Sequence, residues 1–226
     1  MKNIQTLILL LILFLNTAAY AQKPYYKING GKAVNEKKYV QLKNKLAKEG
    51  KIEELNLKTV RKSDSIIHYI KLGNLMTTPD GFDPYGETKK FIGTKFKIEN
   101  FAKSTTENFK DDYLNGKPTL INFWFTRCPP CIQEIPTLNK LKDKFGDKVN
   151  FVSITFDNQK AVDEFLKKYK FEFEHIINSQ NQIDGFSITA YPTSFILDKN
   201  GIIKIVTSEI TEYEVKDIES TLKILL

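Results

Sequence analysis

Cys128 and Cys131 are the only cysteines in the chain, and two prolines separate them. Two thiols at this spacing can close a small disulfide ring, or open it and pass two electrons on. As a cross-link the pair would stabilise the fold poorly, because chain-entropy stabilisation grows with the length of the closed loop. Zinc would need two more ligands, and the only histidines, His68 and His175, lie in unrelated segments. The pair therefore predicts a redox-active disulfide rather than an inert disulfide or half of a zinc site.

The residues around this pair predict a strand before it and a helix after it. Residues 120–125 form an apolar, β-prone run, and residues 131–145 follow a helical pattern. A helix that starts at the motif directs unpaired backbone N–H groups and the positive end of its dipole toward the first sulfur, which favours the thiolate. We therefore expect Cys128 to be the attacking thiol and Cys131 to be the resolving one.

Three further residues near the pair could take part in its chemistry. Glu134 follows Cys131 by three residues, so the two share one helix face. Its carboxylate either complements the helix dipole, or lies close enough to the sulfurs to raise a thiol pKa and carry a proton. Arg127 either stabilises the Cys128 thiolate or steers a partner, or is simply an exposed side chain. We expect Trp124 to pack beneath the motif and to shape the active-site surface.

The first 21 residues have the layout of a secretory signal peptide. Lys2 supplies a positive charge, residues 7–15 are an unbroken apolar run, and residues 19–21 fit a small-x-small cleavage site before Gln22. The apolar run is shorter than the roughly 20 residues of a membrane-spanning helix. An uncleaved anchor is the alternative. We expect a periplasmic or otherwise extracytoplasmic protein without stable membrane insertion after cleavage.

The basic charge of the chain is concentrated in its N-terminal third. Residues 22–90 carry 15 Lys and Arg against 8 Asp and Glu, whereas residues 91–226 carry 18 against 19. This excess is explained either by a solvated helical face or by a specific anionic partner or membrane surface. No nucleic-acid motif accompanies it, so no nucleic-acid partner is expected. The length after residue 21 suits one domain with an appendage, or two small domains.

The apolar pattern changes along the chain and predicts two regions. Between residues 35 and 73 the apolar positions recur at mixed three- and four-residue steps, which predicts a small, mostly helical N-terminal region over residues 22–90. Proline and glycine over residues 77–86 predict a linker or long loop. From residue 91 strands and helices alternate in the order β-α-β-α-β-β-α, which predicts an α/β domain over residues 91–226 with a partly parallel sheet.

Several motifs of the second region resemble a known family. The segment Asn122–Trp124, the Cys-Pro-Pro-Cys motif, Glu134–Pro136 and the later Tyr191–Asp198 resemble, in this order, the thioredoxin superfamily. Within it the chain looks most like the exported thiol-disulfide oxidoreductases of the TlpA/ResA type. The resemblance covers about residues 91–226 and leaves residues 22–90 uncovered. It implies a thioredoxin-like fold, with a mixed central sheet and helices on both faces.

The resemblance also implies roles for particular residues. A proline at the position of Pro192 is cis in this family and faces the cysteine pair, whereas the local sequence alone supports only a turn before a strand. Tyr191 could then offer its backbone to a bound substrate strand. Ordinary thioredoxins have a buried aspartate where this chain has Asn122, and TlpA/ResA-type proteins have a glutamate matching Glu134. The candidate substrate-contacting residues are Trp124, Arg127, Tyr191 and Pro192.

These observations lead to one principal functional hypothesis and two alternatives. The principal one is an exported enzyme that exchanges its dithiol with protein thiols and disulfides as a reductant, for instance of apocytochrome c before haem attachment. The family further implies an upstream membrane electron donor, and neither a cofactor nor a metal is expected. Thr126, two residues before Cys128, suggests a peroxiredoxin-like thiol peroxidase instead. The third hypothesis is a non-catalytic thioredoxin-fold binding protein in which residues 22–90 carry the function.

Overall fold

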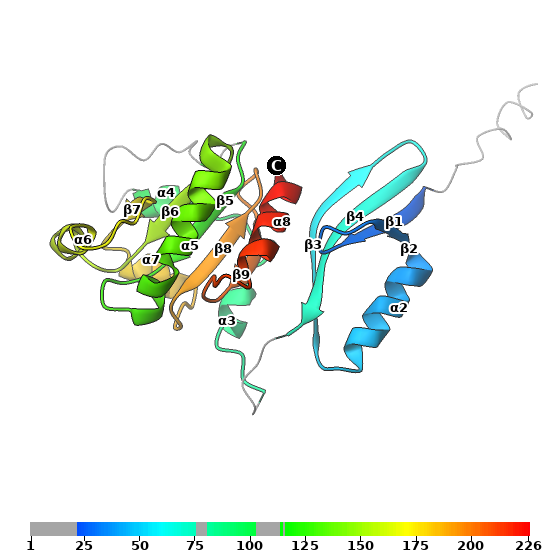
Figure 1. The fold of residues 1–226 in the computed structure, drawn as a ribbon, viewed down its shortest axis with the longest axis horizontal. Coiled ribbons are helices and arrows are strands. Elements are labelled where there is room, and N and C mark those ends of the chain that lie inside the picture. Colours follow the sequence, from blue (N-terminus) through cyan, green and yellow to red (C-terminus); the bar gives the residue numbers. More distant parts are fainter. Residues whose placement is uncertain (1–21, 76–80, 103–113, 115) are drawn as a thin grey trace, which may run out of the picture.

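The computed structural model of the chain describes residues 22–75, 81–102, 114 and 116–226. These residues form two β-sheets that lie side by side, each with its own helices (Figure 1). The expected signal peptide and part of the expected linker lie outside the described residues. Within the described ranges, no helix is both long and apolar enough to cross a membrane.

The larger unit is built on a five-stranded sheet with strand order β7-β6-β5-β8-β9. β5, β6 and β7 run parallel to one another. β8 runs antiparallel to β5, and β9 runs antiparallel to β8. Every residue of β5, β6 and β8 is buried, as expected for central strands with apolar runs and helices on both faces. The mixed sheet agrees with the sequence prediction. The strands are β5 (Thr119–Phe123), β6 (Asn150–Ile154), β7 (Glu174–Ile176), β8 (Thr193–Leu197) and β9 (Ile203–Thr207).

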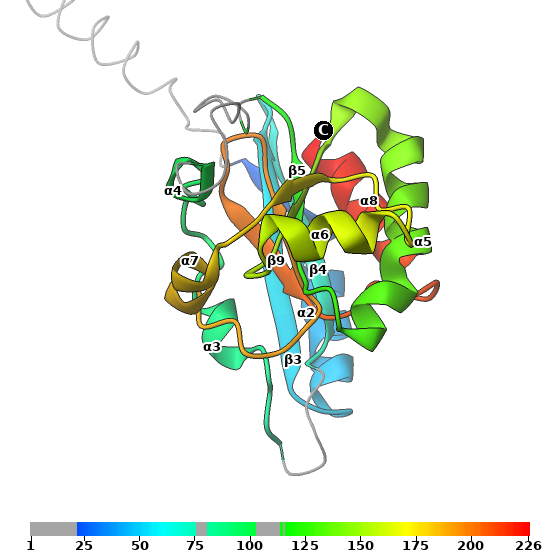
Figure 2. The ribbon, with the colours of Figure 1, turned by 90° about the vertical axis from the view of Figure 1, so that its left-hand side faces the viewer.

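Helices cover both faces of this sheet, as the sequence predicted (Figure 2). On one face, α5, α6 and α8 contribute to an apolar core that includes Leu138, Phe165 and Leu222. On the other face, a second core joins α4 and α7 to the sheet through residues such as Phe101 and Ile183. The helices are α3 (Gly86–Lys89), α4 (Glu99–Ala102), α5 (Pro129–Phe145), α6 (Gln159–Leu166), α7 (Gln180–Gly185) and α8 (Val215–Leu225), with a 3-10 turn at Gly146–Lys148.

The N-terminal region is mostly β-structure, so the prediction of a mostly helical region was wrong. Its sheet has the strand order β2-β1-β4-β3, and α2 packs on one face. β3 has a bulge between Asn56 and Lys58, which interrupts the two-residue alternation of its apolar side chains, so that Leu57 and Val60 are three residues apart. The elements are β1 (Lys23–Ile28), β2 (Ala33–Asn35), α2 (Glu36–Ala47), β3 (Ile52–Arg61) and β4 (Ser65–Asn74).

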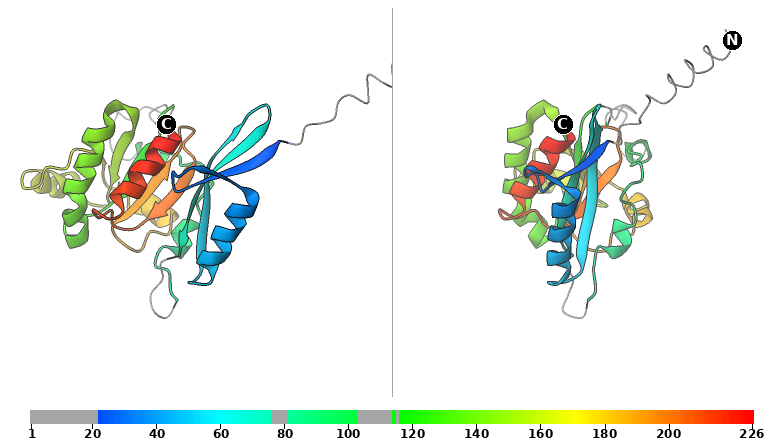
Figure 3. Two further views of the ribbon diagram at one scale, coloured as in Figure 1. Left: turned by 45° about the vertical axis from the view of Figure 1, so that its right-hand side comes forward. Right: turned by 90° about the vertical axis from the view of Figure 1, so that its right-hand side faces the viewer.

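The two units are packed against each other through β3 and α8 (Figure 3). Leu57 of β3 is only 3% exposed and belongs to the same apolar core as Ile218 and Leu222 of α8. The Lys58 ammonium donates to the carbonyl of Ile224 at 3.2 Å. Opposite sides of the N-terminal sheet therefore have different partners, because α2 covers one face and the larger unit covers the other.

The turn between β1 and β2 also reaches α8. Gly30 has a φ of +74° there, and a Cβ atom at this position would lie 2.4 Å from the Ser220 hydroxyl oxygen. Glycine supplies both the left-handed backbone and the close approach. The turn between β1 and β2 therefore comes close to α8 of the larger unit.

Candidate active site

A disulfide joins Cys128 and Cys131 at the N-terminus of α5. Cys128 is the N-cap of the helix, and its sulfur accepts a hydrogen bond from the backbone N–H of Cys131 at 3.3 Å. The two intervening prolines occupy the first two helical positions, where the missing N–H groups cost least. The sequence prediction that a helix starts at the motif is confirmed. Cys128 lies at the helix end whose dipole favours a thiolate.

The disulfide is covered in this structure, since each cysteine is only 2% exposed. The neighbouring Arg127 and Pro129 are exposed. The two sulfurs are therefore largely shielded from solvent, and Arg127 adds a positive charge at the nearby surface. A functional role of Arg127 stays a prediction.

Asp157, which follows β6, holds the turn that leads into the disulfide. Its carboxylate accepts a hydrogen bond from the backbone N–H of Thr126 at 2.6 Å. The backbone N–H of Cys128 then donates to the carbonyl of Phe125 at 3.2 Å. Asp157 therefore acts as a turn residue, and it positions the backbone just before Cys128.

Glu134 is a buried carboxylate one helical turn beyond Cys131, with only 1% of its surface exposed. One of its oxygens accepts from the side-chain amide of Asn122 in β5 at 2.7 Å. The other accepts from the backbone N–H of Ile210, beyond β9, also at 2.7 Å. Asn122 donates in addition to the Ser194 hydroxyl of β8 at 3.1 Å. A single carboxylate thus joins α5 to the sheet and to the segment before α8.

Burial raises the pKa of Glu134 to about 7, and the charge of Glu209 acts in the same direction. The hydrogen bonds from Ile210 and Asn122 favour the ionised form and limit the rise in its pKa. A carboxyl group with a pKa near 7 exchanges protons readily at neutral pH. An acid that only complemented the helix dipole would be exposed, with its pKa unchanged or lowered. Glu134 therefore differs from an exposed acid at a helix end, and its proton-carrying role stays a prediction.

The sequence identified Asn122 and Glu134 but missed Ile210 and Ser194. Ile210 contributes only its backbone N–H, for which a sequence carries no signal. Ser194 faces Asn122 because β5 and β8 pair antiparallel in that register. A Ser before three apolar residues gives no hint of this partner.

The peptide bond between Tyr191 and Pro192 is cis, as the family resemblance implied. Thr193, the next residue, pairs with Phe123 at the end of β5, and the disulfide loop follows β5. Pro192 therefore lies at the same end of the sheet as the disulfide. The Tyr191 ring packs edge-on to Phe125, with centroids 5.3 Å apart, and burial raises its pKa to about 12. Substrate contact by Tyr191 and Pro192 stays a prediction.

Trp124 is completely buried, and substrate contact by this side chain stays a prediction. Its ring packs against Phe165 and Phe171, with centroids 4.8 and 5.3 Å apart. A residue just after a central strand points into the core when helices cover the sheet, and α6 covers this face. The expected packing beneath the motif is confirmed.

The two histidines lie in different sheets and have ordinary structural partners. His175 of β7 shares hydrogen bonds with the Ser153 hydroxyl at 2.5 Å and the Phe171 carbonyl at 3.0 Å. Burial lowers the pKa of His175, which favours its neutral form. His68 of β4 stacks on Tyr26, with centroids 5.2 Å apart.

Comparison with known proteins places this site in a family. The model of the AhpC/TSA family matches residues 92–206. Thioredoxin-like protein YneN of Bacillus subtilis (strain 168) is 36% identical over 125 residues, which cover 52% of this chain and 74% of that protein. Thiol-disulfide oxidoreductase ResA of Bacillus cereus is 35% identical over 129 residues, which cover 55% of this chain and 73% of that protein.

Among solved structures, StoA from Bacillus subtilis shares 30% sequence identity with this chain. The TM-score is 0.42, and the match covers 47% of this chain and 84% of that chain. The family match begins after the N-terminal sheet. The chain therefore belongs to the AhpC/TSA family and is one of its thioredoxin-like thiol-disulfide oxidoreductases.

Proposed function

We propose that the chain reduces disulfide bonds in protein substrates outside the cytoplasm, by exchange with Cys128 and Cys131. The observation that carries this proposal is a disulfide at a helix N-terminus with a buried carboxyl group one turn further along the same helix. The first feature favours a thiolate, and the second offers a proton acceptor with a pKa of about 7.

Exchange starts from the reduced enzyme. The Cys128 thiolate attacks one sulfur of a substrate disulfide, which forms a mixed disulfide and releases the other substrate sulfur as a thiolate. The Cys131 thiolate then attacks the Cys128 sulfur, which releases the second substrate thiol and forms the internal disulfide. The enzyme gives two electrons to the substrate. The two released substrate thiolates take up protons from solvent, and Cys131 gives up its own proton before it attacks.

Glu134 serves the resolving step in this proposal. Cys131 must lose its proton before its sulfur can attack, because the thiolate is the nucleophile. Glu134 lies three residues beyond Cys131 on the same helix, a spacing that makes side chains neighbours. A carboxylate with a pKa of about 7 accepts this proton near neutral pH and returns it to solvent later.

The cellular context is part of the same proposal. Residues 1–21 have the pattern of a signal peptide, which supports export to the periplasm or another extracytoplasmic compartment. A reductant outside the cytoplasm needs a source of electrons. We assign this role to a membrane protein that reduces the disulfide of Cys128 and Cys131 with its own pair of thiols. Relatives named ResA and the resemblance to TlpA/ResA-type proteins suggest apocytochrome c, before haem attachment, as one substrate.

Reduction of insulin by dithiothreitol tests the proposed activity. Wild-type protein should accelerate the precipitation of the insulin B chain, and Cys128→Ser should abolish the acceleration. A wild-type protein without this activity would overturn the proposal and favour a non-catalytic binding protein. Consumption of hydrogen peroxide far faster than by a free thiol would favour the peroxidase alternative instead.

A further inference from the structure

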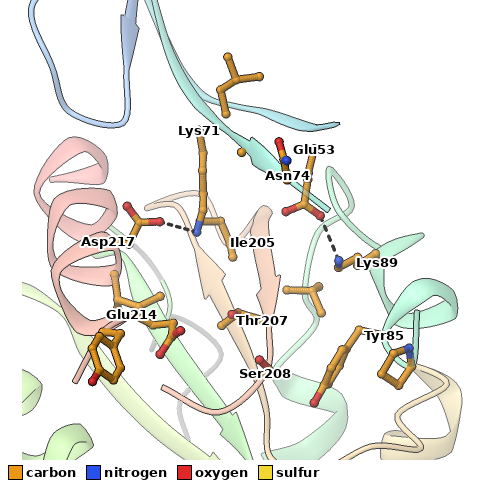
Figure 4. A pocket seen from close by; sticks show the side chains of 16 residues that line it. Glu53, Lys71, Asn74, Tyr85, Lys89, Ile205, Thr207, Ser208, Glu214 and Asp217 are labelled. Carbon is orange, nitrogen blue, oxygen red and sulfur yellow. Dashed lines mark ion pairs between the residues drawn. The ribbon is translucent and has the colours of Figure 1, made fainter. Parts of the chain in front are cut away.

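A cavity of about 610 Å³ lies between the N-terminal sheet and the larger unit (Figure 4). Its walls come from β3 and β4 on one side, and from β9, α8 and the residues around α3 on the other. This volume falls within the range of about 300–1,000 Å³ that is typical of ligand sites. The cavity is outside the cysteine site, and the exchange reaction described above does not use it.

Both lysines that line the cavity are already paired with carboxylates. Lys71 lies 3.1 Å from Asp217 of α8, and Lys89 lies 3.1 Å from Glu53 of β3 (Figure 4). Lys89 also lies 3.1 Å from Asp83, a second acid at the edge of the cavity. Neither lysine is therefore free to attract an anion.

Counted together, the charged groups that line the cavity carry a net negative charge. Glu214 also lines the cavity, and its carboxylate accepts a hydrogen bond from the backbone N–H of Thr211. The lining thus carries three carboxylates against two ammonium groups, and Asp83 and Glu209 add negative charge beside it. An entering cation meets an excess of negative charge.

Tyr85 is a cavity residue on which several of these negative charges act. Its hydroxyl contacts Ser208, and the pKa of Tyr85 is raised first by burial and then by the charges of Glu134, Asp83 and Glu209. The negative charges that disfavour the ionised form of Tyr85 also favour a cation near its ring. A second aromatic residue, Tyr213, lines the cavity and is 91% exposed. Aromatic faces bind ammonium and guanidinium groups.

The cavity is linked to the cysteine site by a short segment. Ser208 lines the cavity, and two residues later the backbone N–H of Ile210 donates to Glu134. The charge of Glu134 also helps to raise the pKa of Tyr85. A group bound in the cavity therefore lies beside the segment that holds the carboxylate of the cysteine site.

We propose that this cavity binds the positively charged side chains, lysine or arginine, of an extended segment of the protein substrate whose disulfide is exchanged at Cys128. This inference rests on the proposed function. It assigns substrate selection to the N-terminal sheet, because β3 and β4 form one wall of the cavity. Charge complementarity of this kind favours the matching partner and excludes partners of like charge.

The test compares three disulfide peptides of one sequence that differ only in flanking lysine, glutamine or glutamate residues. For wild-type protein, kcat/KM should be about tenfold higher with the lysine peptide than with the glutamine peptide, and lower still with the glutamate peptide. The preference should shrink in 0.5 M NaCl, because both charges are partly solvated.

Two variants test whether the preference for the lysine peptide arises in the cavity. Asp217→Asn and Glu53→Gln each leave a cavity lysine without its partner, so each should reduce the ratio of the lysine to the glutamine peptide to about one. The matched control is Glu172→Gln, which removes the partner of Lys170 far from the cavity and should keep the wild-type ratio. Measuring the ratio in two separate variants keeps the test valid if one of them folds poorly.

A binding measurement separates this inference from the proposed function. A tri-lysine peptide without cysteine should bind wild-type protein in calorimetry, and Asp217→Asn should weaken that binding at least fivefold. Equal rates for the three peptides, or a preference for glutamate, would overturn the inference while leaving the exchange activity intact. Binding of spermidine without binding of tri-lysine would also overturn it, in favour of a small free cation. Binding of tri-lysine without reduction of any peptide would sink the proposed function instead.

Discussion

Glu134 joins the cysteine helix to two other parts of the chain through hydrogen bonds with Asn122 and Ile210. Both hydrogen bonds are 2.7 Å long, and the carboxyl group is 1% exposed. The ionised form has lost its water shell and is stabilised only by these donors, so it forms at a higher pH than in solution. This balance is what allows one residue to change its charge within the pH range of thiol chemistry.

Glu134→Gln should alter the pH dependence of Cys128 alkylation in the reduced enzyme. A carboxylate near the thiols raises their pKa, so its removal should shift the midpoint of the iodoacetamide rate profile to lower pH by about one unit. Glu164→Gln, which removes an exposed acid of α6, is the control and should leave the profile unchanged. A profile unaffected by Glu134→Gln would return this residue to the helix-dipole role.

The same group makes folding stability depend on pH. Folded protein binds the Glu134 proton up to a pH of about 7, whereas the unfolded chain releases it near 4.5. The stabilising contribution is therefore present below pH 4.5 and is lost as the pH rises to about 7, by on the order of 3 kcal/mol. Urea unfolding at pH 5 and pH 8 should show this loss in wild type. Glu134→Gln should lose much less stability over the same interval, and an equal loss in both proteins would contradict the assignment.

At this scale the sequence predicted the residues from which the candidate site is built. Cys128, Cys131 and Glu134 were found because thiols and carboxylates are recognisable by type and spacing, and the cis bond before Pro192 came from the family resemblance. Ile210 was missed because a backbone N–H has no sequence signature. The burial of Trp124 agrees with the expected packing beneath the motif, and its assignment to substrate contact stays a prediction.

At the scale of elements, the site is held by the turn between β5 and α5. This turn is not fixed by β5 or α5 alone, because Asp157 reaches it from the loop after β6. The hydrogen bond to Thr126 fixes the backbone two residues before Cys128. The geometry at the helix N-terminus therefore depends on the pairing of β5 with β6.

Asp157→Ala should destabilise the folded protein by about 1–3 kcal/mol, because it leaves the Thr126 N–H without its charged acceptor. It should also lower the rate of insulin reduction, since the backbone before Cys128 loses its support. Asp163→Ala is the control, because its partner is an exposed glutamine side chain and the expected loss is below about 0.5 kcal/mol. Equal losses for the two variants in urea unfolding would argue against a special role of Asp157.

The elements of the larger unit could be predicted because their apolar patterns are simple. Residues 131–145 keep a helical period, and the apolar runs of β5, β6 and β8 are short and separated by turns. The N-terminal elements were predicted wrongly. The bulge at Asn56 and Lys58 interrupts the strand alternation of β3, so that Leu57 and Val60 are three residues apart, a step that also occurs on a helix face.

At the scale of the whole molecule, the N-terminal sheet and the larger unit share one apolar core. Leu57 is buried among residues of α8, and the partly buried Leu55 and Tyr69 pack against the same cluster. Nothing in the sequence distinguishes these side chains from an ordinary strand face, so their docking could not be predicted. The arrangement makes β3 and β4 one wall of the cavity described above.

Leu57→Ala should lower the free energy of unfolding by about 2–5 kcal/mol, because it opens a cavity at the contact with α8. Val40→Ala is the control, since Val40 is 43% exposed and its truncation should cost below about 0.5 kcal/mol. If the two units unfolded in separate transitions, and the variant shifted only the N-terminal one, the shared core would contribute little to the stability of the enzyme.

The central claim is that Cys128 attacks the substrate and Cys131 resolves the mixed disulfide. The most direct test is mass spectrometry, under non-reducing conditions, of reduced single-cysteine variants mixed with a peptide disulfide. Cys131→Ser should accumulate a stable adduct with half of the peptide, because Cys128 attacks and no resolving thiol remains. Cys128→Ser should form this adduct at least tenfold more slowly. Faster adduct formation by Cys128→Ser than by Cys131→Ser would contradict the assignment and exchange the roles of the two thiols.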